Sequence, residues 1–261
     1  MKLYRLLIIS LFALLLIQGS AFDLARAQGP GAHHYYFPAM FKGEPIRLDD
    51  FSTLDPVWTV LNMKSSDSDT FFEKRDGVFY CELRDNSDRW IAHPGWRPLG
   101  DFKLEVDARF DRPDDPNRDT PPAQTRSGLG VLFGGSDDWS EGYAFMLGYF
   151  GRQHQWALLR FDGRKADGEY KTAKLINYGG APPFVKGFAG WNHLEIVRIR
   201  DRIYLYCNGQ RMPMPAPYYT YVQDGKYGTR RLVGVTTSTW EWNFDKIEFD
   251  NFELTPLSMP Y

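Results

Sequence analysis

Residues 101–110, DFKLEVDARF, alternate polar and apolar side chains without a break. Strict alternation is the period of a β-strand with one buried face, and it argues against an amphipathic helix here. The residues expected to face a core are Phe102, Leu104, Val106, Ala108 and Phe110. The residues expected on the opposite, polar face are Lys103, Glu105, Asp107 and Arg109.

Strand-like patterns recur along most of the chain after residue 45. The other segments of this kind are 70–83, 127–135, 142–150, 155–163, 192–212, 231–239 and 245–254. Asp76-Gly77 and Asn208-Gly209 tolerate positive φ, so each predicts a tight turn. About ten to twelve short strands without a convincing amphipathic helix predict an all-β fold, a two-sheet antiparallel β-sandwich.

The N-terminus has the pattern of a secretory signal peptide over residues 1–27. A basic start leads into the apolar run 6–17, and Ala25-Arg26-Ala27 is a cleavage pattern. The apolar run is shorter than the roughly 20 residues that a membrane-spanning helix needs. We therefore expect a secreted, extracytoplasmic protein with no membrane insertion after cleavage.

Cleavage would change the charge of the chain only slightly. The segment removed carries Lys2, Arg5 and Arg26 against Asp23, so the formal net charge moves from −2 to −4. This mild acidity argues against nucleic acid and anionic membrane surfaces as partners.

The remaining sequence predicts one domain with flanking segments. We expect an extended leader over 28–45, a β-domain over 46–255 and a short tail over 256–261. The proline-rich stretch 111–127 predicts a long loop, which is either functional or a solvated excursion. His33-His34 in the leader is a weak metal-ligand pattern, since adjacent histidines on such a segment usually bind nothing.

Two cysteines, Cys81 and Cys207, are too few for a disulfide scaffold or a zinc site. Cys81 shares strand parity with Phe79 and Leu83, and Cys207 shares it with Leu205, so both thiols should face the apolar side. A disulfide between them and two separate buried thiols both satisfy this pattern in an exported protein.

Glu248, Asp250 and Glu253 have the Glu-x-Asp-x-x-Glu spacing of one class of retaining glycosidases. Such enzymes need two carboxyl groups about 5 to 5.5 Å apart. Regular alternation would turn Glu253 to the other face. A bulge near Asn251 would return Phe252 to the apolar face and place Glu253 beside Asp250.

Aromatic side chains are candidates for carbohydrate contacts because flat sugar faces stack on them. The candidates are Trp139, Tyr143, Tyr149, Trp156, Trp240 and Trp242. A hairpin turning at 151–154 would put Tyr149 across from Trp156. The loop that contains Trp139 also carries Asp137, Asp138 and Glu141, which suit sugar hydroxyls or calcium. For each aromatic, core packing is the alternative.

The opening "DDFSTLDPVW", the block "WNHLEIVRIRDRIYLYCNGQRM" and the closing "FDKIEFDNFEL" resemble the concanavalin A-like lectin/glucanase superfamily. The resemblance is closest to its laminin-G-like bacterial members and to the 3-keto-disaccharide hydrolase group, and covers roughly residues 46–255. It implies a jelly roll, often with carbohydrate binding on or beside its concave sheet. It also implies a structural calcium ion, for which Asp50 and Asp250 loosely match the ligand positions.

The resemblance argues against two catalytic assignments. In family 16 glycoside hydrolases the carboxylate signature lies on a mid-chain strand, whereas Glu248 to Glu253 lie near the end of this chain. Glu105 and Asp107 lie mid-chain, but Arg109 stands where the third carboxylate is expected. Arginine cannot act as a general acid. No G-x-S-x-G, P-loop or H-E-x-x-H motif occurs.

These observations favour a secreted carbohydrate-binding β-sandwich that recognises a polysaccharide or glycan through aromatic residues and is not catalytic. One alternative is a glycoside hydrolase of the family 16 or 3-keto-disaccharide type. Another is a cell-surface adhesion or structural module, because the same fold carries several functions.

Overall fold

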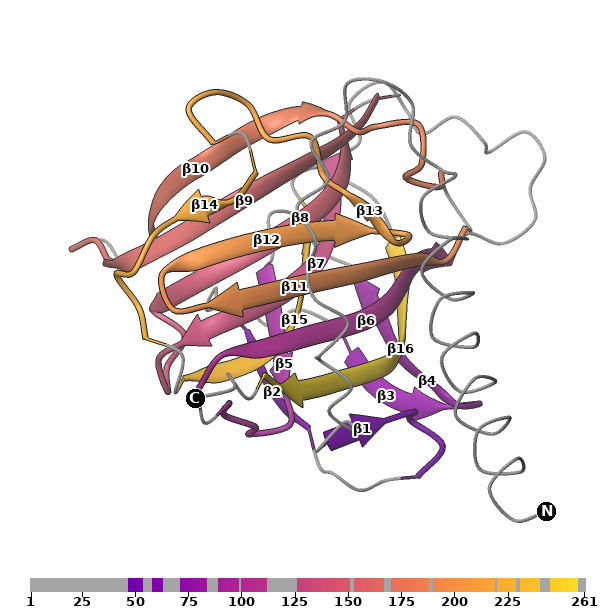
Figure 1. The fold of residues 1–261 in the computed structure, drawn as a ribbon. Coiled ribbons are helices and arrows are strands. Elements are labelled where there is room, and N and C mark those ends of the chain that lie inside the picture. The colour runs from indigo at the N-terminus through magenta and orange to yellow at the C-terminus, as the bar shows by residue number, and fades with distance from the viewer. Residues whose placement is uncertain are drawn as a thin grey trace, which may run out of the picture. The chain divides into compact units, whose positions relative to one another are not determined.

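The structure, a computed structural model, describes residues 47–53, 58–62, 71–83, 89–98, 100–111, 126–150, 153–166, 170–187, 190–218, 220–228, 231–239 and 245–257. These residues form two antiparallel sheets of nine and seven strands, with no helix among them (Figure 1). The predicted all-β, two-sheet fold is confirmed. The described strands number sixteen, more than predicted. Strands of two to four residues leave no readable alternation, and two longer strands, Arg89–His93 and Tyr170–Gly180, also lie outside the predicted segments.

The nine-stranded sheet has the order β13-β12-β11-β6-β16-β4-β3, and β1 and β14 pair with β16 and β12. Its strands are β1 (Arg47–Asp49), β3 (Phe71–Arg75), β4 (Val78–Leu83), β6 (Phe102–Asp111), β11 (Asn192–Ile199), β12 (Arg202–Cys207), β13 (Gln210–Arg211), β14 (Val222–Gln223) and β16 (Asp245–Pro256). Both predicted tight turns are present, with positive φ at Asp76, Gly77, Asn208 and Gly209.

The seven-stranded sheet has the order β10-β9-β8-β7-β15-β5-β2. Its strands are β2 (Thr59–Asn62), β5 (Arg89–His93), β7 (Arg126–Gly135), β8 (Glu141–Phe150), β9 (Gln153–Arg164), β10 (Tyr170–Gly180) and β15 (Leu232–Thr239). It packs against the nine-stranded sheet through one large apolar core that both sheets share.

The alternation of β6 is confirmed, because its apolar residues all lie in this core and none is more than 7% exposed. Its polar residues face away from the core. We call the side of the nine-stranded sheet that faces away from the core the outer face. Lys103, Glu105, Asp107 and Arg109 lie on the outer face.

The bulge predicted in the last strand is present. β16 pairs with β6 at Asp250↔Asp107 and next at Glu253↔Glu105, which leaves one extra residue on β16. Asn251 takes up this residue with a left-handed φ of 49°, a conformation that asparagine tolerates. Phe252 is consequently fully buried, and Glu253 returns to the outer face.

The β8–β9 hairpin has a tighter register than predicted. Tyr149 pairs with His154, and Leu147 pairs with Trp156, whereas a turn over 151–154 would place Tyr149 opposite Trp156. The difference arises because Phe150 and Gln153 already pair, which leaves two residues between the strands. A shift of two residues does not change the strand parity, so Leu147 and Trp156 stay on one face of the hairpin, as predicted.

Cys81 and Cys207 are both free and fully buried, so the alternative of two separate thiols holds. Both face the core, as predicted. They lie on β4 and β12, and β11, β6 and β16 intervene. At about 4.8 Å per strand the two backbones are separated by about 19 Å. A disulfide requires Cα atoms less than about 7 Å apart, so this fold does not allow the bond.

Several predictions lie outside the described residues. These are the signal peptide over 1–27, the leader over 28–45, most of the 111–127 loop, the tail beyond residue 257, and Trp240 and Trp242. None of the described residues forms a helix with the length and apolarity that crossing a bilayer requires.

Candidate functional site

Acidic side chains form a row across the centre of the outer face. Glu195 on β11 lies directly opposite Glu105 on β6, and Glu105 lies opposite Glu253 on β16. Cross-strand neighbours have Cβ atoms about 4.5 to 5.5 Å apart, and like charges in such positions destabilise a sheet. A row of three glutamates therefore needs compensating positive charge.

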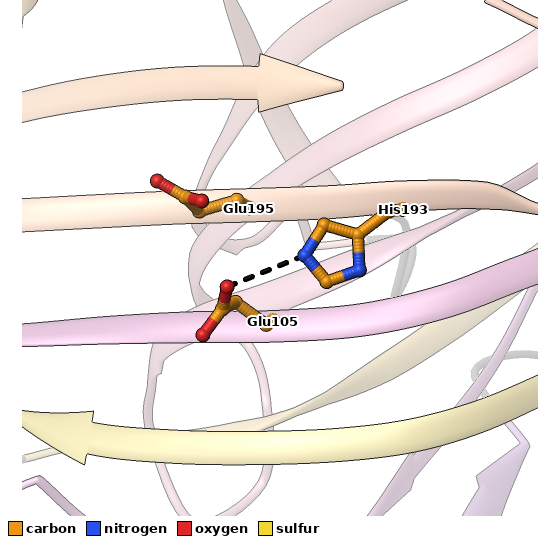
Figure 2. Close-up of side chains that lie close together, drawn as sticks. All are labelled: Glu105, His193 and Glu195. Atoms are coloured by element: carbon orange, nitrogen blue, oxygen red, sulfur yellow. Dashed lines mark hydrogen bonds and ion pairs between the residues drawn. The ribbon is translucent and has the colours of Figure 1, made fainter. Parts of the chain in front are cut away.

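His193 supplies part of that charge. It lies opposite Asp107 and two residues before Glu195 on β11. Its Nδ1 is 2.8 Å from Asp107 Oδ1, and its Nε2 is 3.3 Å from Glu105 Oε1. Figure 2 shows the imidazole of His193 facing the Glu105 carboxylate across the gap between the two strands. The imidazole therefore bridges both carboxylates of β6.

The turn after β12 fixes the backbone of His193. The His193 N–H donates to Asn208 Oδ1 at 2.9 Å, and the Asn208 N–H donates to the His193 carbonyl at 2.8 Å. The Asn208-Gly209 turn, which the sequence predicts, thus holds the first residues of β11 in register beside β6.

Hydrogen bonds control the protonation of this cluster. Those to Asp107 and then Glu105 raise the pKa of His193 to about 10. Burial alone would raise the pKa of Glu105, but hydrogen bonds from His193 and Lys103 outweigh it and hold that pKa below its usual value. The pKa of Asp107 is lowered in the same way, with Asn251 as a second donor. Both carboxylates are consequently ionised at neutral pH.

The pKa of Glu195 is shifted in the opposite direction from those of Glu105 and Asp107. Burial and the negative charge of Glu105 raise its pKa. Among the described residues, none donates a hydrogen bond to its carboxylate. The ligand atoms of Glu105, His193 and Glu195 lie within 4.8 Å of one another, so this group has the composition and spacing of a metal-binding set.

The carboxylates of β16 lie on the outer face, but other groups engage two of them. Arg109 Nε is 2.5 Å from Glu248 Oε2, and Thr255 Oγ1 donates to Glu253 at 2.9 Å. Burial, with repulsion from Asp107 and Asp50, raises the pKa of Asp250. The fold thus brings the proposed Glu-x-Asp-x-x-Glu carboxylates to one face, with Glu248 held in an ion pair.

Three of the predicted aromatic contacts are buried in the fold. Trp139 and Tyr143 are fully buried and Trp156 is 3% exposed, so none of them offers a stacking surface. The Trp139 ring packs so closely on Gly135 that a Cβ there would lie 2.3 Å from it. Tyr143 donates its hydroxyl proton to Asp224 Oδ1 at 2.8 Å. Tyr149 lies on β8, paired with His154.

The acidic residues of the 136–141 loop make local contacts. Asp138 accepts from the Ser136 hydroxyl at 2.7 Å and from the Ser140 amide at 3.0 Å, which closes the turn. Asp137 pairs with Arg97, and Glu141 pairs with Arg231. These interactions account for all three carboxylates without a ligand.

Two tyrosines that were not predicted as ligand contacts lie on the outer face beside the acidic row. Tyr206 on β12 is directly opposite Glu195, and Tyr204 is opposite Val197. The Tyr204 and Tyr221 rings lie 5.4 Å apart. The signal was present in RIYLYC, where the tyrosines alternate with apolar residues that face the core.

The predicted calcium ligands do not form a recognised group in the described part of the chain. Asp50 accepts from the amide and the hydroxyl of Ser52, at 3.0 and 2.6 Å. Neither Asp50 nor Asp250 belongs to a cluster of three or more His, Cys, Asp or Glu ligands among the described residues. The calcium site stays a prediction.

Comparison with solved structures places the fold among jelly-roll β-sandwiches. A carbohydrate-binding module (CBM2) of the evolved Dit protein of Lactobacillus casei BL23 phage J-1 matches with a TM-score of 0.54 and 10% identity, over 83% of this chain and 97% of that one. The laminarinase catalytic domain of Thermotoga maritima matches with a TM-score of 0.51 and 11% identity, over 83% and 99%. A galectin-like protein of unknown function from Bacillus subtilis matches with a TM-score of 0.50 and 11% identity, over 82% and 96%.

At 10 to 11% identity these similarities show the fold alone, and membership of the concanavalin A-like superfamily stays a prediction. No family model matches the chain, and no curated protein matches it. The finer resemblance to laminin-G-like or 3-keto-disaccharide hydrolase members stays a prediction.

Proposed function

We propose that this protein is a secreted carbohydrate-binding β-sandwich that recognises a polysaccharide or glycan without cleaving it. The observation that carries the proposal is that an aromatic side chain, Tyr206, lies next to the row of glutamates on the outer face. Tyr206 lies across from Glu195, and Glu195 lies across from Glu105. Tyr206 thus stands at one end of the row of glutamates, one strand away from Glu195.

Such a surface offers both contacts that a sugar makes. The C–H face of a sugar ring packs on an aromatic ring, and sugar hydroxyls donate to ionised carboxylates in charge-assisted hydrogen bonds. Glu105 and Asp107 have lowered pKa values and are therefore acceptors at neutral pH. The neighbouring folds, a carbohydrate-binding module and a laminarinase, support carbohydrate as the ligand class.

The protonation states favour binding over cleavage. A general acid for glycoside hydrolysis must hold a proton near neutral pH. Glu105 and Asp107 are hydrogen bonded to His193, which lowers their pKa values, so these two carboxylates are poor proton donors.

A glycoside hydrolase is the second candidate, and the Glu105–Glu195 pair is the observation that favours it. The two carboxylates are cross-strand neighbours with opposite pKa shifts. This is the environment that separates a nucleophile from a general acid. An adhesion module has weaker support, because the large apolar side chains exposed among the described residues are only Leu48 and Val60.

Affinity gels and reducing-end assays with α- and β-glucans, galactans and xylans test the proposal. The purified protein should be retarded by at least one polysaccharide without releasing reducing ends. Tyr206→Ala and Glu195→Gln should weaken retardation. Glu73→Gln, on edge strand β3 four strands from Glu195, should not. Release that Glu195→Gln abolishes would make the protein a hydrolase, and no retardation by any polysaccharide would count against carbohydrate binding.

A further inference from the structure

We propose that Glu105, His193 and Glu195 bind one divalent transition metal ion, of the zinc or manganese class, on the outer face. The three residues lie on the adjacent central strands β6 and β11, and each offers one ligand atom within 4.8 Å of the others. Strands inside a sheet hold ligands more rigidly than loops do.

The geometry fits such an ion with small side-chain movements. Two ligands bound about 2.1 Å from a tetrahedral metal lie about 3.4 Å apart. The His193 Nε2 and Glu105 Oε1 atoms are already 3.3 Å apart, and a bound metal ion would take the place of the Nε2 proton, which is released to solvent. Glu195 lies on the same strand face as His193, two residues further along β11 (Figure 2). Its carboxylate has no hydrogen-bond donor among the described residues, so it is available to bind an ion.

Asp107 provides the second contact that metal-binding histidines characteristically have. Its Oδ1 lies 2.8 Å from His193 Nδ1, which orients the ring and directs Nε2 toward Glu105. Carboxylates in this position fix the tautomer of a metal-bound histidine and raise its basicity. Asn251, at the β16 bulge, in turn donates to Asp107 Oδ2 at 2.9 Å. The bulge thus supports the site indirectly.

The ligand set selects the class of metal. One imidazole and two carboxylates suit zinc or manganese, whereas calcium prefers six to eight oxygen ligands. Lys103 is the competing cation, because its Nζ lies 2.6 Å from Glu105 Oε2. Its side chain is 30% exposed, so it can turn toward solvent when a metal binds.

The metal ion would also contribute to carbohydrate binding, and this part of the inference rests on the function proposed above. Three protein ligands leave coordination positions open on a zinc or manganese ion. Adjacent sugar hydroxyls are oxygen ligands that can occupy them, and Tyr206 lies beside Glu195 to contact the ring. We therefore infer that the glycan is bound partly through the metal.

Calorimetric titration of the metal-free, untagged protein with ZnCl₂, MnCl₂ and CaCl₂ tests the site. One equivalent of zinc or manganese should bind, and calcium should bind far more weakly. Glu195→Gln should weaken binding at least about tenfold, and Asp107→Asn should weaken it about 10- to 100-fold. Glu253→Gln, which removes a charge from the same row, should change affinity less than about threefold. The double variant His33→Gln, His34→Gln should also keep the wild-type affinity, and far-UV circular dichroism should show that every variant is folded.

The outcomes separate the metal site from the proposed function. Failure of both zinc and manganese to bind, or equal binding by Glu195→Gln, overturns the metal site. Retardation of the protein in polysaccharide gels should fall with EDTA and return with the metal. Unchanged retardation in EDTA overturns the metal's part in glycan binding and leaves the proposed function standing. Metal binding by a protein that no polysaccharide retards supports the metal site and overturns the proposed function.

Discussion

Phe252→Ala tests the bulge that brings the β16 carboxylates to the outer face. Phe252 is fully buried. Its ring centroid lies 5.1 Å from that of Trp58, nearly perpendicular to it, and 5.7 Å from that of Trp96. Truncating a buried phenylalanine costs about 3 to 5 kcal/mol, and each aromatic pair contributes about 0.5 to 1.5 kcal/mol beyond burial. We therefore expect Phe252→Ala to lower the unfolding free energy by about 4 to 5 kcal/mol.

Urea unfolding followed by tryptophan fluorescence and far-UV circular dichroism measures this loss. Asn251→Gly is the control, because glycine tolerates the left-handed φ of 49° at this exposed position and should cost less than about 1 kcal/mol. Without the bulge, Phe252 would point outward, and its truncation would change stability by about 0.5 kcal/mol or less. A loss below about 1 kcal/mol for Phe252→Ala would refute the register described here.

Three further predictions concern buried polar and thiol groups. Asp49 accepts hydrogen bonds from the Phe51 amide, the Trp58 indole and Lys74, so Asp49→Ala should lower the urea-unfolding free energy by about 3 to 5 kcal/mol. Dithiothreitol should leave the melting temperature unchanged, because both cysteines are free; a fall would indicate a disulfide. Burial raises the pKa of Cys207 to about 12, above the roughly 8.5 of an unfolded thiol. The protonated Cys207 thiol therefore makes its full contribution to the unfolding free energy below about pH 8.5, and this contribution is lost as the pH rises toward 12. The unfolding free energy of Cys207→Ala should consequently fall less steeply than that of the wild type between about pH 9 and 11. An equally steep fall in both proteins would contradict this.

Strand parity predicted which face each side chain of β6 and β16 occupies, because a half-buried strand has a period of two. It could not predict which strands are neighbours. Four complete strands, β7 to β10, separate Glu105 from Glu195 in the sequence, yet the two residues lie opposite each other. That pairing is decided by packing between distant segments, so the sequence identified Glu105 and Asp107 but not their partners His193 and Glu195.

Three of the aromatic candidates, Trp139, Tyr143 and Trp156, are buried for a different reason. In the seven-stranded sheet, side chains of both parities are buried. A second apolar cluster, which includes Trp139, Leu132 and Met146, lies on the face away from the main core. Strands buried on both faces read as nearly continuous apolar runs, and GVLFGG and YAFMLGY have that character. The second run begins at Tyr143 and was the available evidence that this side chain packs inside the fold, whereas Trp139 lies between the two runs.

Carboxyl footprinting with a bound glycan tests whether the outer face is the ligand site. Carbodiimide labelling of carboxylates, read by mass spectrometry, compares the free protein with the protein saturated by the polysaccharide that retards it most. We expect reduced labelling at Glu195 and Glu253 and unchanged labelling at Asp137, whose side chain is 82% exposed in the loop between β7 and β8. Protection of Asp137 with unchanged labelling of Glu195 and Glu253 would contradict this expectation.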